Sequence, residues 1–308
     1  GQIGDGLSIS RVGNPALASL SSTDVAFFDN TNKELRCYTF DDTNWTQKGN
    51  GLSIASVNIP ALASLNSTDV AFIDSGNDEL RCYTFDGTNW TQKGSGLSIT
   101  GAGTPALASL NSTDVAFFDD TNAELRCYTF DGTSWTQKGS GLSMALHGFP
   151  AFPAIAGLSS TDVAFIDTFQ RELRCYTFDG TSWTQKGNGL SIAPHGYPAL
   201  ASLSSTDVAF IDGDNDELRY YTFDGTNWTQ KGSGLSIGGV SFPAIAGLSS
   251  TDVAFIDIGN KELRTYKFFF DYDSTSINIA NDVTVSEFTI GKSILIRRTS
   301  DYDGNPVT

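Results

Sequence analysis

The sequence predicts an all-β protein in which six copies of one unit close into a ring. The motif Thr-Asp-Val-Ala-Phe recurs at intervals of 45, 45, 48, 45 and 45 residues. Its copies begin at Thr23, Thr68, Thr113, Thr161, Thr206 and Thr251. Each copy also holds four short apolar runs separated by turn residues, which is typical of a small antiparallel sheet. Four strands in about 45 residues is the size of a propeller blade, so we expect a six-bladed β-propeller.

The second copy illustrates the predicted blade. Its first run, 61–65, alternates small and large residues, which suits an inner strand near a crowded axis. The second run, 70–73, is apolar on both faces and predicts burial between neighbouring sheets. The third run, 79–85, alternates apolar and polar residues, and a turn at Asp86-Gly87 leads to the fourth run, 90–93.

The two chain ends predict how the ring closes. The last copy follows the pattern through Phe268 but lacks the turn and tryptophan that introduce a fourth strand. Residues 2–9 match residues 47–54, which form the fourth run of the first copy. We therefore expect the N-terminal strand to complete the sixth blade and remove the open edges. The propeller is predicted to span 1–269, followed by a short β-rich tail at 270–308.

Net charge limits the classes of partner. The chain carries a formal charge of −16, which repels phosphate backbones and anionic lipid, so nucleic acid is not expected as a partner. No apolar run approaches the roughly 18 residues of a membrane span.

The four cysteines occupy one equivalent position in four successive copies. They are Cys37, Cys82, Cys127 and Cys175. Equivalent positions on neighbouring units should lie too far apart for a disulfide, so we expect free, buried thiols.

The sequence offers little catalytic chemistry. It contains two histidines and no recognisable nucleophile, zinc or phosphate-loop motif. Its carboxylates recur at fixed places in every copy. Asp69 and Asp74 are expected to pair with Arg81 or cap turns, and ligand contact is the alternative. We therefore predict a protein that is not an enzyme and requires no cofactor.

One loop resembles a calcium site. Asp212, Asp214 and Asp216 alternate in copy five as the acids of a calcium loop do. The alternative is a plain polar hairpin in which Asn215 adopts the left-handed conformation.

Two sets of aromatic residues are candidates for ligand binding. Trp90, Trp135 and Trp183 share one position after the turn, where they are packing anchors or stacking platforms for a sugar ring. The second set lies in the loops that vary most between copies and emerge on one face of the ring. It comprises His147, Phe149, Phe152, His195, Tyr197 and Phe242. The alternative explanation is that the tight turns of the opposite face tolerate less change.

The order of motifs in each copy, a short apolar strand followed by an Asp-Gly turn and a tryptophan three residues beyond the glycine, resembles the fungal fucose-specific lectins. The resemblance implies a six-bladed ring with sugar sites between blades, and it covers the repeats but not the tail. Each site of that family uses an arginine on the second strand and a glutamate on the third. The corresponding residues in copy two are Val70 and Cys82, so the family's fucose contacts are not carried over.

These observations favour a binding module over an enzyme. We expect multivalent carbohydrate recognition, with glycans as partners, by a protein that is extracellular or displayed on a surface. The alternative is a structural or adhesive component of a virion or cell envelope. In that case the tail would anchor the ring to an assembly or to a surface protein.

Overall fold

The computed structural model describes residues 1–9, 13–55, 57–99, 103–119, 121–144, 153–167, 170–192, 197–213, 215–237, 242–257 and 259–269. The chain divides into two units, Gly1–Phe268 and Phe269–Thr308. The tail predicted at 270–308, with its proposed strands and assembly contacts, lies outside the described residues.

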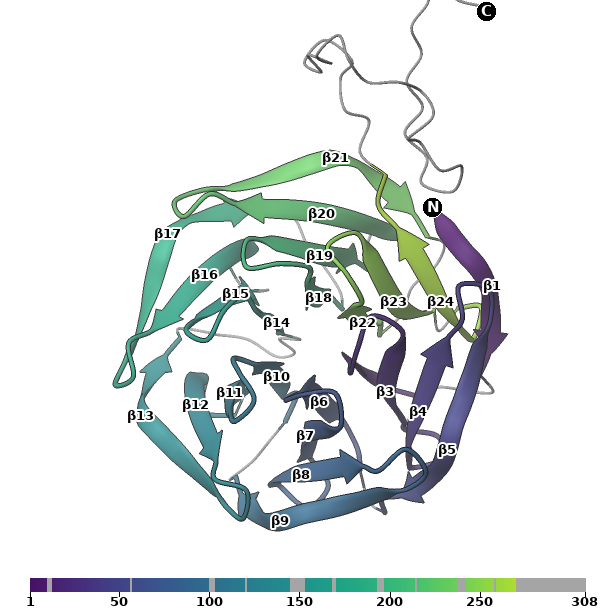
Figure 1. Cartoon of the computed structure of the whole chain (residues 1–308). Helices are drawn as coiled ribbons and strands as arrows, with labels where there is room; N and C mark the ends of the chain where they lie inside the picture. Colours follow the sequence, from purple (N-terminus) through teal and green to yellow (C-terminus); the bar gives the residue numbers. More distant parts are fainter. Residues whose placement is uncertain are drawn as a thin grey trace, which may run out of the picture. The chain divides into compact units, whose positions relative to one another are not determined.

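The first unit is a six-bladed propeller, as predicted, and each blade is a four-stranded antiparallel sheet (Figure 1). Blade 1 comprises β2 (Ala16–Ser19), β3 (Asp24–Asp29), β4 (Glu34–Phe40) and β5 (Trp45–Ser53). Blade 2 comprises β6 (Pro60–Ser64), β7 (Asp69–Asp74), β8 (Glu79–Phe85) and β9 (Trp90–Ser98). Blade 3 comprises β10 (Ala106–Ser109), β11 (Asp114–Asp119), β12 (Glu124–Phe130) and β13 (Trp135–Ser143). Blade 4 comprises β14 (Ala154–Gly157), β15 (Asp162–Asp167), β16 (Glu172–Phe178) and β17 (Trp183–Ser191). Blade 5 comprises β18 (Ala199–Ser202), β19 (Asp207–Asp212), β20 (Glu217–Phe223) and β21 (Trp228–Ser236).

Blade 6 joins the two ends of the propeller. It comprises β22 (Ala244–Gly247), β23 (Asp252–Asp257), β24 (Glu262–Lys267) and the N-terminal strand β1 (Gln2–Ser8). Strand β1 lies antiparallel to β24, with Gln2 opposite Tyr266 and Leu7 opposite Leu263. The predicted closure of the ring by the N-terminal strand is therefore confirmed.

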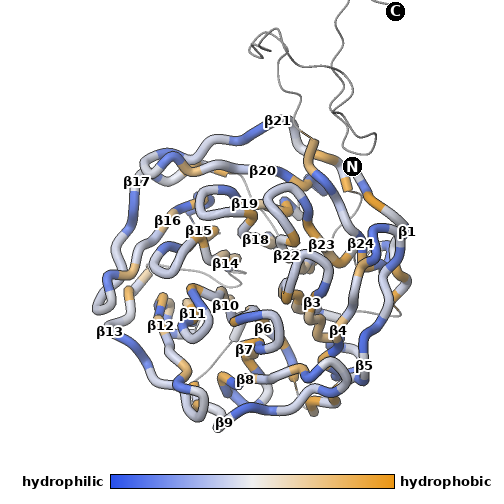
Figure 2. The backbone as a smooth tube through the Cα atoms, in the orientation of Figure 1, coloured by the Kyte–Doolittle hydropathy of each residue, from blue (hydrophilic) through white to orange (hydrophobic). Residues whose placement is uncertain are grey.

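The core lies between blades, because each sheet buries both faces of its inner strands. Every residue of β7 is buried, as its two-sided apolar pattern predicts. The outer strands β9, β13 and β17 are largely hydrophilic (Figure 2). Neighbouring blades share hydrophobic clusters, and one such cluster contains Cys82 of blade 2 and Trp135 of blade 3. The four cysteines are free and buried, as expected.

At five of the six blade boundaries a bulge in the outer strand forms a backbone hydrogen bond to the next blade. In β9 the bulge contains Gly94, whose φ of +67° is a conformation that glycine adopts without steric cost. The next residue, Ser95, donates its N–H to the carbonyl oxygen of Thr133 in the following blade, at 2.7 Å. A side chain at Gly94 would collide with that same carbonyl. At the boundary between blades 5 and 6, Gly232 has the same φ, but a Cβ there would meet no atom within 4 Å.

The ring has two distinct faces. We call the face with the turns between the first and second and between the third and fourth strands of each blade the turn face. It carries segments such as 65–68 and 86–89. The opposite face carries the connections between the second and third strands and between blades, and we call it the loop face.

Candidate functional site

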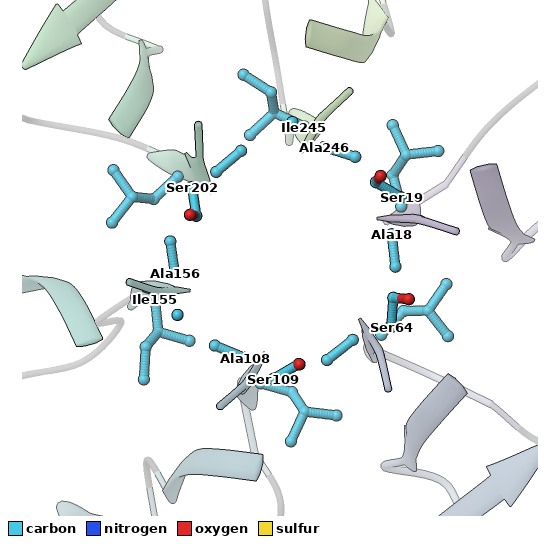
Figure 3. A pocket seen from close by; sticks show the side chains of 18 residues that line it. Ala18, Ser19, Ser64, Ala108, Ser109, Ile155, Ala156, Ser202, Ile245 and Ala246 are labelled. Atoms are coloured by element: carbon cyan, nitrogen blue, oxygen red, sulfur yellow. The ribbon is translucent and has the colours of Figure 1, made fainter. Parts of the chain in front are cut away.

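The six inner strands surround a central channel with a volume of about 210 Å³ (Figure 3). Each blade lines it with a leucine or isoleucine, an alanine, and a serine or glycine. The Ser19 and Ser64 hydroxyls donate to the carbonyl oxygens of Ser21 and Asn66, at 3.1 and 2.9 Å. The channel therefore offers a mostly apolar wall, and these two hydroxyl protons are already engaged.

The mouth of the channel on the loop face forms a smaller pocket of about 100 Å³, lined by one proline from each blade. Tyr197 and Phe242 also line it, and their ring centroids are 3.6 Å apart. Phe242 has a φ of +50°, an unusual conformation for a bulky residue. The structure thus brings together two residues of the predicted aromatic set. The other four, His147, Phe149, Phe152 and His195, lie outside the described residues.

The tryptophans serve as packing anchors between blades. Trp90, Trp135 and Trp183 are each only 3% exposed, so of the two roles considered for them this burial favours packing over stacking on a ligand. Trp90 instead packs on Phe85, with ring centroids 4.9 Å apart. Each of these rings is enclosed by two neighbouring blades, which leaves no room for a sugar above it.

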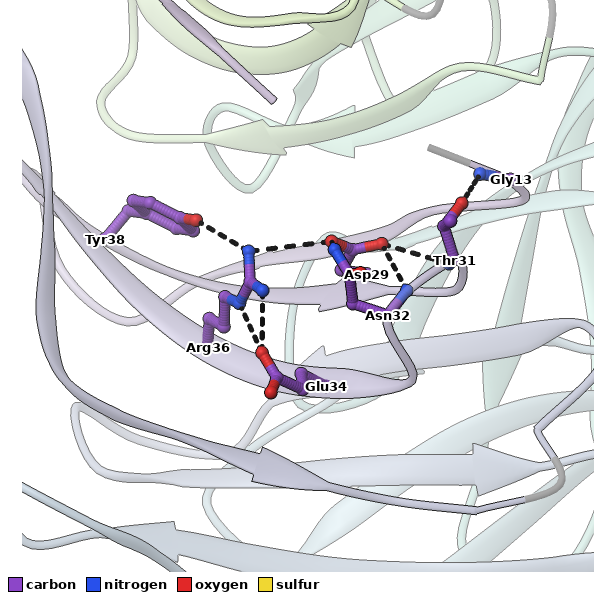
Figure 4. Close-up of polar contacts among 7 residues, drawn as sticks. All are labelled: Gly13, Asp29, Thr31, Asn32, Glu34, Arg36 and Tyr38. Atoms are coloured by element: carbon purple, nitrogen blue, oxygen red, sulfur yellow. Dashed lines mark hydrogen bonds and ion pairs between the residues drawn. The ribbon is translucent and has the colours of Figure 1, made fainter. Parts of the chain in front are cut away.

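A polar network near the loop face fixes the start of the third strand (Figure 4). Arg36 Nε donates to Glu34 Oε2 at 2.9 Å, and Arg36 Nη1 lies 3.5 Å from Asp29 Oδ2. Asp29 also accepts the backbone N–H groups of Thr31 and Asn32, at 3.0 and 3.1 Å. The Asp29 carboxylate therefore caps the loop and neutralises the arginine, which is the structural role predicted for this class of aspartate.

The same network bears on the calcium hypothesis. Asp212 Oδ1 accepts the Asn215 N–H at 3.3 Å, and Asp212 Oδ2 lies 3.3 Å from Arg219 Nη1. Among the described residues no group of three or more His, Cys, Asp or Glu is arranged to hold a metal ion. Asp214 lies outside those residues, so calcium binding by this loop stays a prediction. The left-handed residue of the hairpin is Asp216, with a φ of +52°, rather than Asn215 as expected.

The turn face carries a groove between blades 2 and 3, with a volume of about 320 Å³. Blade 2 lines it with Leu65, Asn66, Asp69 and Lys93, and blade 3 with Ser112, Thr113, Phe130, Asp131 and Gly132. Leu65 and Phe130, one from each blade and both largely buried, give the groove its apolar lining, and the polar side chains supply hydrogen-bond donors and acceptors. We call this site groove 2/3 and name the equivalent positions at the other blade boundaries in the same way.

An ion pair dominates the electrostatics of groove 2/3. Lys93 Nζ lies 2.8 Å from Asp69 Oδ2. Burial would raise the pKa of Asp69, but hydrogen bonds from Lys93, Thr84 and Asn66 outweigh it and hold that pKa below its ordinary value. The hydrogen bond to Asp69 also raises the pKa of Lys93. The groove therefore presents a fixed ammonium at neutral pH.

The second wall adds an exposed carboxylate. Backbone hydrogen bonds from Ser134 and Thr133 lower the pKa of Asp131. Asp131 Oδ1 accepts both of those N–H groups at 2.8 Å. Its other oxygen accepts the Ser134 hydroxyl at 3.1 Å, which leaves it acceptor capacity as far as the described residues are concerned. A neutral polyhydroxylated ligand could thus meet an ammonium on one wall and a carboxylate on the other.

Every blade carries the lysine–aspartate pair, with N···O distances from 2.6 to 3.8 Å. Five lysines come from the outer strand. In blade 6 the outer strand has Ile3 at that register position, and Lys267 of β24 supplies the ammonium to Asp252 at 3.2 Å. The charge is therefore retained in blade 6 although it comes from a different strand.

The boundary between blades 5 and 6 differs from the others, because Tyr220 stands at the cysteine position and Phe269 replaces the acidic turn residue. The Tyr220 hydroxyl donates across the blade boundary to the carbonyl oxygen of Ser250, at 3.5 Å. The Tyr220 ring packs edge-on against Phe268, with centroids 5.1 Å apart. Tyr220 thus extends from the floor of this groove to its far wall.

Lys93 and Asp131 are not among the site residues predicted from the sequence. Both are repeated almost unchanged, and repetition alone does not separate a binding residue from a scaffold residue. One signal for the lysine was present in the sequence of copy six. Lys267 stands there at a position where the other copies have threonine, so the positive charge is kept although it moves to another strand. Asp69 was named, but its partner is Lys93, and Arg81 pairs with Asp74 at 3.3 Å.

Comparisons with known proteins identify the fold. No family model and no curated protein matches the sequence. The fucose-specific lectin from Aleuria aurantia superposes with a TM-score of 0.58 at 16% identity, over 85% of this chain and 93% of that chain. Virginiamycin B lyase from Staphylococcus aureus gives 0.59 at 12% identity, over 86% and 99%. A protein of unknown function from Bacteroides thetaiotaomicron gives 0.59 at 15%, over 85% and 72%. At these identities the similarity concerns the propeller fold alone.

Two residues were matched by sequence register to the fucose contacts of the lectin family. Val70 and Cys82 are both fully buried between blades. Burial raises the pKa of the Cys82 thiol to about 12, and Asp69 adds to this while Lys93 opposes it. These positions belong to the core of the ring. Among the described residues no helix is long and apolar enough to cross a membrane.

Proposed function

We propose that the propeller is a non-catalytic, multivalent carbohydrate-binding ring whose sites are the grooves between blades on the turn face. The observation that carries the proposal is the make-up of groove 2/3. An ammonium (Lys93), a carboxylate (Asp131) and a hydroxyl (Ser112) face a common space of about 320 Å³ beside an apolar wall. Sugars combine vicinal hydroxyls, which both donate and accept, with apolar C–H faces, and this lining complements both.

Repetition supports the proposal, because it places several similar sites on one rigid ring. The acidic turn residue recurs at every boundary except that between blades 5 and 6, where Phe269 takes its position, and the lysine–aspartate pair recurs at all six. Individual sugar contacts are weak, and linked sites raise avidity when a glycan or a glycan-coated surface reaches several of them. The Aleuria aurantia lectin of the same fold is fucose-specific. Glycan partners outside the cell or on a surface fit such a ring.

A glycan array tests the proposal, with the intact chain and a blocked variant side by side. Ser112 is exposed and lines groove 2/3, so Ser112→Tyr and the same change at Ser22, Ser67, Ser160, Ser205 and Ser250 would fill the grooves. The matched control is Thr91→Tyr with its equivalents, on the exposed outer strand. We expect selective binding that free sugar inhibits, that the groove variant loses and that the control keeps. Equal binding by the two variants would refute the groove as the site.

A further inference from the structure

Two of the six blade boundaries differ from the rest in one residue of the kind that lines groove 2/3. Copies two and three place Asn66 and Asn111 at the start of the turn that precedes the second strand, where the other four copies have serine. Asn66 Oδ1 accepts the backbone N–H of Thr68 at 2.9 Å and that of Asp69 at 2.8 Å. In the other copies the serine hydroxyl oxygen accepts the equivalent hydrogen bond, as Ser21 Oγ accepts the N–H of Asp24 at 2.9 Å. Closing the turn therefore does not require asparagine.

The asparagine adds a donor that serine replaces only in part. Asn66 Nδ2 donates to Asp69 Oδ2 at 3.2 Å, and Asn111 Nδ2 donates to Asp114 Oδ2 at 3.1 Å. The side chains of these two aspartates are 11% and 9% exposed. In the four serine copies the aspartate side chains are 16–24% exposed. The amide thus covers the carboxylate.

This cover changes what grooves 2/3 and 3/4 offer a ligand. Lys93 Nζ uses one of its three N–H donors on Asp69. Asn66 Nδ2 uses one of its two donors on the same oxygen. The blade 2 wall of groove 2/3 therefore presents two adjacent donors beside the apolar Leu65, and Phe130 lies on the blade 3 wall. The acceptor Asp131 lies on the opposite wall. In groove 3/4 the same lysine and amide are Lys138 and Asn111.

We propose that grooves 2/3 and 3/4 recognise an N-acetylated sugar through its acetamido group. The carbonyl oxygen accepts from the lysine ammonium and the asparagine amide, and the methyl group packs on the leucine and phenylalanine. The acetamido N–H donates to the aspartate of the facing turn, which is Asp131 in groove 2/3. The serine grooves lack the amide donor and expose more of the carboxylate, which repels a carbonyl oxygen, so they favour plain hexoses. This inference rests on the proposed function and assigns its ligand class.

Equilibrium titration with four monosaccharides tests the inference on the full chain. The sugars are N-acetylglucosamine, N-acetylgalactosamine, glucose and galactose. We expect at least one acetamido sugar to bind about tenfold more tightly than its parent hexose, the effect of one hydrogen bond to a charged donor. The tight class should contain about two sites per chain, one for each asparagine groove.

The variants use residues that the repeat itself accepts. Asn66→Ser with Asn111→Ser converts both grooves to the serine type, and the preference should fall below about threefold while hexose binding persists. Ser159→Asn makes the reverse change in groove 4/5 and should add a third tight site. An unchanged preference in the double variant would overturn the inference. Equal binding of acetamido and parent sugars by the unmodified chain would do the same and leave the proposed function standing. Failure of all four sugars to bind would also overturn the inference, while the proposed function would be refuted only if the glycan array showed no selective binding.

Discussion

A buried hydrogen bond at one blade boundary predicts how the other boundaries can be stabilised. Trp45 Nε1 donates to Thr265 Oγ1 at 3.0 Å, where the chain closes between blades 6 and 1. At four other boundaries the corresponding indole N–H is buried and finds no acceptor among the described residues. These belong to Trp90, Trp135, Trp183 and Trp228. The residue facing each of these tryptophans is a cysteine, which is a weak acceptor.

Cys82→Thr should therefore supply Trp135 with the acceptor that Trp45 already has. Both residues are small and Cys82 is fully buried, so the change conserves packing while adding a hydroxyl. A neutral buried hydrogen bond contributes about 0.5–1.5 kcal/mol net, and an unsatisfied buried donor costs about 1–3 kcal/mol. We expect the free energy of unfolding to rise by about 1 kcal/mol, measured by denaturant titration.

Two controls isolate the hydrogen bond. Cys82→Val has a similar shape but no acceptor and should not stabilise the protein. Thr265→Val removes the existing acceptor and should destabilise the protein by about 1–3 kcal/mol, with the effect largely lost in a Trp45→Phe background. If Cys82→Thr and Cys82→Val changed stability equally, the reasoning about the indole N–H would be refuted.

Three further predictions follow from the geometry of the ring. Lys267→Thr should destabilise the propeller by less than about 1 kcal/mol in a denaturant titration, since the pair is partly exposed, and Ile3→Lys should restore stability. If Ile3→Lys did not restore stability, the register of β1 against β24 would be contradicted. Gly94→Ala should lower the melting temperature more than Gly232→Ala, because both glycines adopt a positive φ but Gly94 alone of the two faces a carbonyl of the next blade. Equal effects would contradict the role of the bulge at Gly94 in joining the blades. Five of the aspartates that begin second strands have lowered pKa values, namely Asp24, Asp69, Asp114, Asp162 and Asp207. Their contribution to the free energy of unfolding is therefore complete above the pKa of the unfolded chain and is lost below about pH 4. Acid titration of Asp69→Asn should show a shallower loss of stability than the unmodified chain.

The sequence predicted the fold closely because the repeat carries the information six times. The spacing of the Thr-Asp-Val-Ala-Phe motif gave the number of blades, and the match of residues 2–9 to 47–54 gave the closure. Burial of the second strands and the free state of the cysteines followed from apolar pattern and symmetry. These properties depend on local pattern and on equivalence between copies, which a sequence displays directly.

The site was harder to predict because it lies between blades. Groove 2/3 joins Lys93 of one unit to Asp131 of the next, and their proximity depends on how the bulge at Gly94 lets the Thr133 turn approach. The burial of the tryptophans depends on the same packing. The Tyr197–Phe242 contact joins loops 45 residues apart, although their shared position in the repeat allowed both to be named.

A crystal structure of the chain with the tightest-binding sugar from the array tests the central claim most directly. We predict sugar density in the grooves of the turn face, with Lys93 and Asp131 in hydrogen-bond contact in groove 2/3. Sugar bound only at the channel mouth, against Tyr197 and Phe242, with all grooves empty, would contradict the account.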